Sequence, residues 1–157
     1  MLKILVAVDG SELSLDGVRH TLQLLKQGLQ AGVVLAHVQE PATLYELVTT
    51  RDPDLIAAAS LEAGEHLLAP ARALLDAAGV AYETDIAVGD AAHTLVDLAE
   101  NHGADMLVIG AKGHGALSGA LLGSVSQEVS RLSSVPVTIV KHPEVVLADE
   151  VMDDETE

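Results

Sequence analysis

The sequence contains no cysteine, no phenylalanine and no tryptophan, and its only tyrosines are Tyr45 and Tyr82. The lack of cysteine excludes disulfides, thiolate metal sites and thiol catalysis. Hydrophobic residues still make up 49% of the 157 residues, so the chain can build one domain around an aliphatic core. No apolar run reaches the roughly 18 residues of a membrane-spanning helix, and we expect no membrane span.

Positive charge is also scarce. Eight Lys and Arg stand against 24 Asp and Glu, a formal net charge of −16. Nucleic-acid binding needs basic surface to neutralise phosphates, so we expect no nucleic-acid partner. The opening MLKILVAVDG is too short, and too soon interrupted by Asp9, for a signal peptide, which favours a cytoplasmic protein. Residues 143–157 are acidic and aperiodic, and we expect a disordered tail there after a domain spanning 1–142.

Apolar runs and helical patterns alternate along the chain. The expected strands are 2–8, 33–38, 82–87, 106–109 and 135–140, with 82–87 at a sheet edge because one side of it is polar. The expected helices are 15–29, 54–78 (kinked or divided at Pro70), 91–102 and one beginning at 124, with a long loop at 39–53. This alternation predicts an α/β fold with a parallel sheet and helices on both faces.

Polar side chains stand where three of these helices begin. Asp9 or Ser11 can cap the first helix, and Asp90 the third. Ser124, followed three residues later by Gln127, has the pattern of a capping box for the last helix.

A glycine-rich stretch, Ile109 to Ser126, joins the fourth strand to the last helix and reads IGAKGHGALSGALLGSVS. Glycine lets a backbone turn sharply and approach a ligand closely, and a helix start offers free N–H groups and a positive dipole end to an anion. The spacing Gly110-x2-Gly113-x9-Gly123-Ser124 matches neither the P-loop nor GxGxxG. The spacing alone supports a phosphate cradle and a ligand-free glycine loop equally.

Three segments together resemble the universal stress protein family. The glycine spacing looks like the ATP-binding signature of that family, and Ile4–Ser11 and Ser134–Val140 are similar to its opening and closing strands. The resemblance covers about residues 1–142. It implies a Rossmann-like, doubly wound, open five-stranded parallel sheet in the order 3-2-1-4-5. Doubly wound sheets bind ligands at the carboxyl ends of the strands where the winding reverses, so Asp9 and Gly110 are expected to meet in one crevice.

The resemblance also implies a ligand and its contacts. ATP, or ADP or AMP, is expected there, with Mg²⁺ bound through the phosphates. Ala7 and Val38 are expected near adenine, and Asp9 near ribose or Mg²⁺. Because Lys112 is the only Lys or Arg between Asp105 and Arg131, backbone N–H groups are expected to supply much of the phosphate affinity. The residues expected to bind nucleotide are Ala7, Asp9, Val38, Gly110, Lys112, Gly113, His114, Gly123, Ser124, Val125 and Ser126.

Three functions are compatible with this pattern. The first is a nucleotide-sensing regulator of an unidentified protein partner, which is favoured because the glycine signature is complete. The second is a nucleotide-free dimeric interaction module of the same family. The third is a slow ATPase or a protein that phosphorylates itself at Ser124 or Ser126; no catalytic residue is expected, since HExxH and GxSxG are absent. A homodimer is expected through the apolar strand Val135–Val140.

Overall fold

The computed structural model describes residues 1–40, 53–112 and 122–143. Most of the loop expected at 39–53 and of the expected tail lies outside these residues. The strands are β1 (Leu2–Ala7), β2 (Ala31–Gln39), β3 (Tyr82–Val88), β4 (Met106–Gly110) and β5 (Val137–Val140). The helices are α1 (Leu15–Lys26), α3 (Pro53–Ala77), α4 (Ala91–His102) and α5 (Ser124–Leu132).

All five strands run parallel in the order β3-β2-β1-β4-β5, which confirms the expected doubly wound sheet. β1 is the central strand, and Ala7 at its end pairs with Ala36 on one side and with Ile109 on the other. β3 is an edge strand, as its alternating polar pattern predicted. The winding therefore reverses between β1 and β4.

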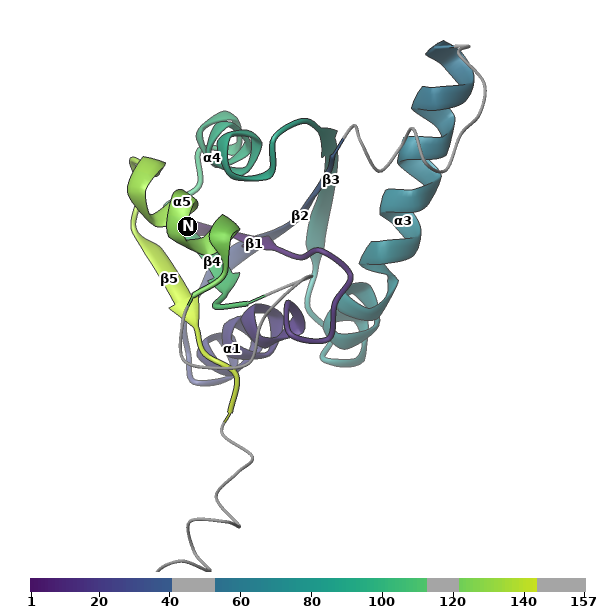
Figure 1. Cartoon of the computed structure of the whole chain (residues 1–157). Helices are drawn as coiled ribbons and strands as arrows, with labels where there is room; N and C mark the ends of the chain where they lie inside the picture. The colour runs from purple at the N-terminus through teal and green to yellow at the C-terminus, as the bar shows by residue number, and fades with distance from the viewer. Residues whose placement is uncertain (41–52, 113–121, 144–157) are drawn as a thin grey trace, which may run out of the picture.

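Helices cover both faces of the sheet, α1 and α3 on one face and α4 and α5 on the other (Figure 1). Each face has its own aliphatic core, because successive side chains of a strand point to opposite faces. Ile4, Val6 and Val8 of the first segment pack with α1 and α3, whereas Leu5 and Ala7 pack with α4 and α5. This double burial explains why the central strands are mostly apolar on both faces, with polar exceptions such as Lys3 and His37.

Three expected boundaries are wrong. α1 ends at Lys26 rather than continuing to residue 29, because the chain turns at Gly28, whose φ is +114°. α3 remains one helix of 25 residues and is not divided at Pro70, which lies on its exposed side. β5 is limited to Val137–Val140, so residues 135 and 136 precede the strand.

The residues predicted to begin and end α4 lie next to it in sequence, and the structure confirms both. The Asp90 carboxylate accepts a hydrogen bond from the His93 N–H, as an N-cap residue does. Gly103 ends the helix in the left-handed conformation with φ +65°.

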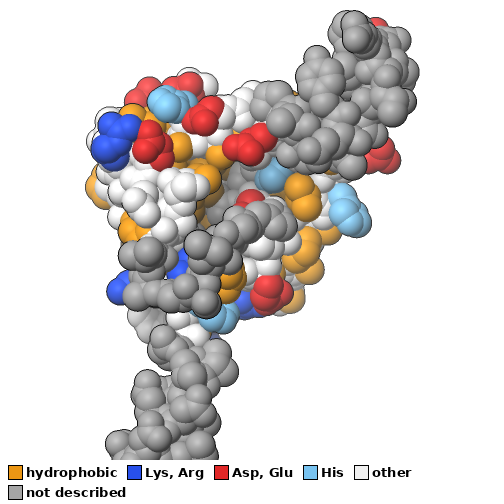
Figure 2. All heavy atoms as spheres, viewed as in Figure 1, with side chains coloured by type: hydrophobic (Ala, Val, Ile, Leu, Met, Phe, Trp, Pro, Cys, Tyr) orange, Lys and Arg blue, Asp and Glu red, His pale blue; other side chains and the backbone are white. Residues whose placement is uncertain are grey.

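The face seen in Figure 1 carries scattered acidic side chains and few basic ones, with hydrophobic side chains between them (Figure 2). None of the helices within the described ranges is long and apolar enough to cross a membrane.

Candidate functional site

The segments after β1 and β4 lie against each other at the carboxyl edge of the sheet. Ala7 and Ile109 are paired and buried, so the residues that follow them leave the sheet side by side. A Cβ added to Gly110 would lie 2.9 Å from the Leu13 carbonyl oxygen, which shows how closely the 9–14 segment passes over this glycine. Glycine at 110 is therefore required by a close approach of backbone to backbone.

The Asp9 carboxylate organises the turn that leads from β1 into α1. Its Oδ1 accepts hydrogen bonds from the backbone N–H of Ser11 at 2.9 Å and from the Ser11 hydroxyl at 2.6 Å. The Ser14 hydroxyl accepts from the Asp9 N–H at 3.2 Å and donates to the Ser11 carbonyl at 2.8 Å. The N-cap position of α1 is Ser14, so the expectation of Asp9 or Ser11 as the cap is wrong.

The start of α5 is fixed by hydrogen bonds to Ala111, the residue just after β4. The Ala111 carbonyl accepts from the Gly123 N–H at 2.7 Å and from the buried Ser126 hydroxyl at 2.9 Å. The Ala111 N–H in turn donates to the Val140 carbonyl at 2.8 Å. Ser126 therefore ties the first turn of α5 to the end of β4.

The capping box expected at this helix is wrong. The N-cap residue is Gly123, which has no side chain to supply a cap, and Ser124 is the first helical residue. The Gln127 side chain donates instead to the Leu122 carbonyl at 3.0 Å. Within residues 1–40, 53–112 and 122–143, no side chain caps the first turn of α5, and the N–H groups and positive dipole end of such a turn suit an anion.

The two described ends of the glycine-rich stretch, Lys112 and Gly123, lie close together. A Cβ on Gly123 would lie 3.5 Å from the Lys112 Cα and 3.3 Å from the Ala111 carbonyl oxygen. Ser124 is exposed beside them, and Ser126 points inward. Gly113 and His114 lie outside the described residues.

Three of the expected contacts are apolar and lie on one face of the sheet. Ala7 is buried in the core shared with α4 and α5, and Val38 and Val125 pack against the same core. They are on the side of the sheet from which α5 starts. The residues expected near adenine and near phosphate thus share the face covered by α4 and α5.

His37 is a buried polar residue at this edge of the sheet, and no sequence motif marks it as part of the site. Its ring lies 2.9 Å from the Val8 carbonyl oxygen through Nδ1 and 3.0 Å from Gln39 Oε1 through Nε2. It links the end of β2 to the residue just before Asp9. Its position inside the apolar run 33–38 indicated that it is buried. A buried polar side chain needs hydrogen-bond partners, and these are Val8 and Gln39.

No cluster of three or more metal-ligating side chains occurs within residues 1–40, 53–112 and 122–143. The site built from these residues is instead one of backbone groups and hydroxyls beside a buried apolar floor. Such groups bind and orient an anionic ligand.

Comparison with known proteins gives the family. The universal stress protein family model matches residues 1–141. Universal stress protein MJ0531 of Methanocaldococcus jannaschii is 30% identical over 141 residues, which cover 90% of this chain and 82% of that protein. Universal stress protein YxiE of Bacillus subtilis is 33% identical over 146 residues, with coverage of 88% and 98%.

Solved structures agree with this match. Hypothetical protein MJ0577 has a TM-score of 0.75 and 27% identity, with 91% of this chain and 97% of that one covered. A universal stress protein in complex with cAMP has a TM-score of 0.61 and 31% identity, with coverage of 88% and 95%. The chain therefore belongs to the universal stress protein family.

Proposed function

We propose that this protein binds an adenine nucleotide at the β1–β4 edge and acts as a nucleotide-sensing regulator in a stress response. The observation that carries the proposal is the first turn of α5, which no described side chain caps and which starts beside Ala111 and Lys112, the residues that follow Gly110. The relative that was crystallised in complex with cAMP is 31% identical to this chain, which supports an adenine nucleotide as the ligand class.

In this proposal each part of the nucleotide has its own partners. The phosphates accept hydrogen bonds from the N–H groups that begin α5 and from the exposed Ser124 hydroxyl, with Lys112, Gly113 and His114 nearby. Asp9 binds a ribose hydroxyl or Mg²⁺, because a bare carboxylate would repel phosphate. Ala7 and Val38 provide the apolar wall for adenine.

ATP with Mg²⁺ is the proposed physiological ligand. The protein carries a net charge of −16, so a triphosphate must bind against the overall field. Mg²⁺ bridging the phosphates would offset part of that repulsion. ADP, AMP and cAMP carry less charge and are the competitors to test.

The first experiment is to identify what the purified protein carries. The protein is denatured without added nucleotide, and the supernatant is analysed by chromatography with mass detection. Near one adenine nucleotide per chain supports the proposal and names the ligand. For protein that carries none, thermal shifts with ATP, ADP, AMP and cAMP, each with and without Mg²⁺, give the order of affinity.

An empty protein that none of these nucleotides stabilises would contradict the proposal and favour a nucleotide-free interaction module. Incubation with γ-labelled ATP separates binding from chemistry. Label retained on the protein would indicate phosphorylation at Ser124 or Ser126, and Ser124 is the better acceptor because it is exposed. Free labelled phosphate would indicate slow hydrolysis.

We further propose a cytoplasmic homodimer that pairs through β5. The Pro136 and Val140 carbonyls bond to β4, so the backbone groups of Val137 and Ile139 alternate away from it toward the open edge of the sheet. Ile139→Pro removes an outward N–H, and Ile139→Ala removes similar packing but keeps that N–H. Sedimentation should show a monomer for the proline variant and a dimer for the alanine variant. A dimer in both folded variants would refute this interface.

A further inference from the structure

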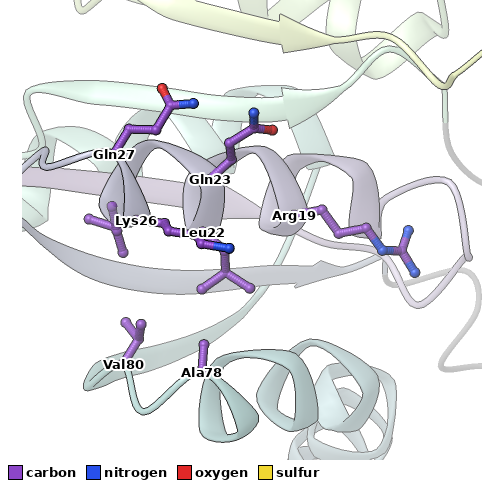
Figure 3. Close-up of a pocket in the computed structure, with 8 residues that line it drawn as sticks. Arg19, Leu22, Gln23, Lys26, Gln27, Ala78 and Val80 are labelled. Atoms are coloured by element: carbon purple, nitrogen blue, oxygen red, sulfur yellow. The ribbon is translucent and has the colours of Figure 1, made fainter.

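A shallow groove lies between α1 and the turn that joins α3 to β3 (Figure 3). Its volume is about 900 Å³. Ala78 and Val80 lie across from α1, with Arg19 toward one end of the helix and Lys26 toward the other. α1 and α3 both end where the next strands begin, so the groove extends to the edge of the sheet opposite the proposed nucleotide site.

The groove combines an apolar floor with two basic side chains. Leu22, Leu25 and Val80 are only partly buried and pack on the core beneath α1 and α3. Arg19 and Lys26 are two of only eight Lys and Arg in the chain. The Arg19 guanidinium already lies 2.8 Å from the Glu12 carboxylate. Lys26 is exposed and forms no ion pair with any residue that the structure describes. The surface therefore suits a segment that is apolar and acidic.

The last described residues bring the chain to α1. His142 Nδ1 lies 3.0 Å from Oδ2 of Asp16, in the first turn of that helix. Asp16 and Lys26 are ten residues apart on α1, or about 15 Å at 1.5 Å per residue. An extended chain covers that distance in about five residues. The five residues 144–148, when extended, are therefore long enough to span the distance from Asp16 to Lys26 along α1.

The sequence after Pro143 has matching chemistry in a matching order. Glu144 is followed by the apolar residues 145–148, and then by Asp149 and Glu150. We propose that residues 144–152 of this chain dock in the α1 groove. The apolar residues cover Leu22, Leu25 and Val80, and Asp149 and Glu150 lie near Lys26.

The charges alone hold this segment weakly, because exposed ion pairs contribute little and salt screens them. Burial of the apolar residues is the larger contribution. Docking should therefore weaken when either the apolar block or the basic side chain is removed, and high salt should weaken it only in part. The inference does not depend on nucleotide binding, since the groove extends away from that site.

The lack of cysteine allows a clean test on the full-length chain. Thr156→Cys carries a nitroxide, and paramagnetic broadening is measured on the backbone amides. We expect the amides of Lys26, Gln27 and Val80 to be broadened several-fold more than those of α5. Lys26→Glu, or Val146→Ser with Leu147→Ser, should remove this difference. Arg131→Glu is the control, because it makes the same charge change on an exposed site of α5.

Uniform broadening over the surface, or broadening centred on the β1–β4 edge, would overturn the proposal. A mixed sample of nitroxide-labelled chain and ¹⁵N-labelled chain that carries no nitroxide separates docking within a chain from docking between copies. Groove broadening in the mixed sample that matches the original pattern would show docking in a second copy and would also overturn it.

Discussion

The helices α4 and α5 pack together on one face of the sheet, and each follows a strand, yet they begin in opposite ways (Figure 1). α4 begins at Asp90, whose carboxylate accepts the His93 N–H at 3.0 Å. α5 begins at Gly123, and its nearest buried hydroxyl, on Ser126, donates back to carbonyl groups. One helix carries its own anion at the N-terminus, and the other has no carboxylate there among the residues that the structure describes.

The difference follows from where the two helices begin. α4 follows the edge strand β3, while α5 follows β4, which is next to β1 where the winding reverses. A helix start at the reversal point is where doubly wound sheets bind ligands. An acidic cap there would occupy the position of a phosphate and repel it. Under the proposed function, the lack of an acidic cap on α5 within the described residues is the feature that would let a phosphate bind there and not at α4.

Gly110→Ala should have the largest effect, because it disturbs the backbone on which the α5 site is built. The added Cβ would meet the Leu13 carbonyl oxygen at 2.9 Å and the Lys112 carbonyl oxygen at 3.4 Å. We expect a loss of about 1–3 kcal/mol in the free energy of unfolding, measured with urea, together with weaker nucleotide binding. Gly32→Ala is the control, since the nearest atom is 3.9 Å away, and it should change stability by less than about 0.5 kcal/mol. Equal losses in the two variants would contradict the close approach.

Ser124→Asp should place a carboxylate in the first turn of α5, one position after the N-cap site that Asp90 occupies in α4. The new carboxylate would lie at the positive end of the helix and repel a phosphate there. We expect nucleotide affinity to fall about tenfold or more, which corresponds to about 1.4 kcal/mol, while thermal stability is kept. Calorimetric titration measures this.

Ser130→Asp is the matched control for that change. It adds the same charge at an exposed position on α5, two turns from the N-terminus. It should leave nucleotide affinity within a factor of about two. If both variants lose affinity equally, the effect comes from net charge and not from the helix start.

The parts of the fold that could be predicted from the sequence are those set by residues close together in the chain. The central strands are buried on both faces and so appear as mostly apolar runs, and Asp90 and Gly103 lie next to the helix that they cap and end. The close passage of Leu13 and Ser14 over Gly110 is consistent with the strand order, which came from the family resemblance.

Contacts distant in sequence explain what could not be predicted. Ser124 has the pattern of a cap, but the N-cap is Gly123, and the buried Ser126 hydroxyl of the same turn bonds to Ala111, fifteen residues away. Pro70 does not divide α3 because it faces solvent, where water can satisfy the carbonyl that it frees. The partners of His37 are likewise set by strand packing.

Ser126→Ala should loosen the start of α5 without changing its charge. It removes hydrogen bonds to the Ala111 and Gly123 carbonyls from a buried side chain. We expect a loss of about 1 kcal/mol in unfolding free energy. Ser130→Ala removes an exposed bond to Gln127 and should be close to neutral in the same urea titration. A neutral result for both would mean that Ser126 does not anchor the helix.

Asp90→Ala should have the smallest effect, and it makes the start of α4 resemble that of α5. Hydrogen bonds from the His93 ring and backbone N–H lower the pKa of the Asp90 carboxyl. Folding thus favours the ionised form, so its contribution is full above the ordinary aspartate pKa of about 4 and is lost as the pH falls through the lowered value. The melting temperature of the variant should lie a few degrees below the parent at neutral pH and converge with it in acid.

Asp97→Ala is the control for that substitution. Asp97 is exposed in the middle of α4, and replacing it with alanine removes the same charge. The melting temperature of this variant at neutral pH measures the loss of one exposed charge on α4 without the loss of a cap. Nucleotide affinity should be unchanged in both variants, since the proposed phosphate site lies at the start of α5 and not at that of α4. A loss of affinity in Asp90→Ala alone would mean that the two helix starts act together, and the ligand site would then have to extend to α4.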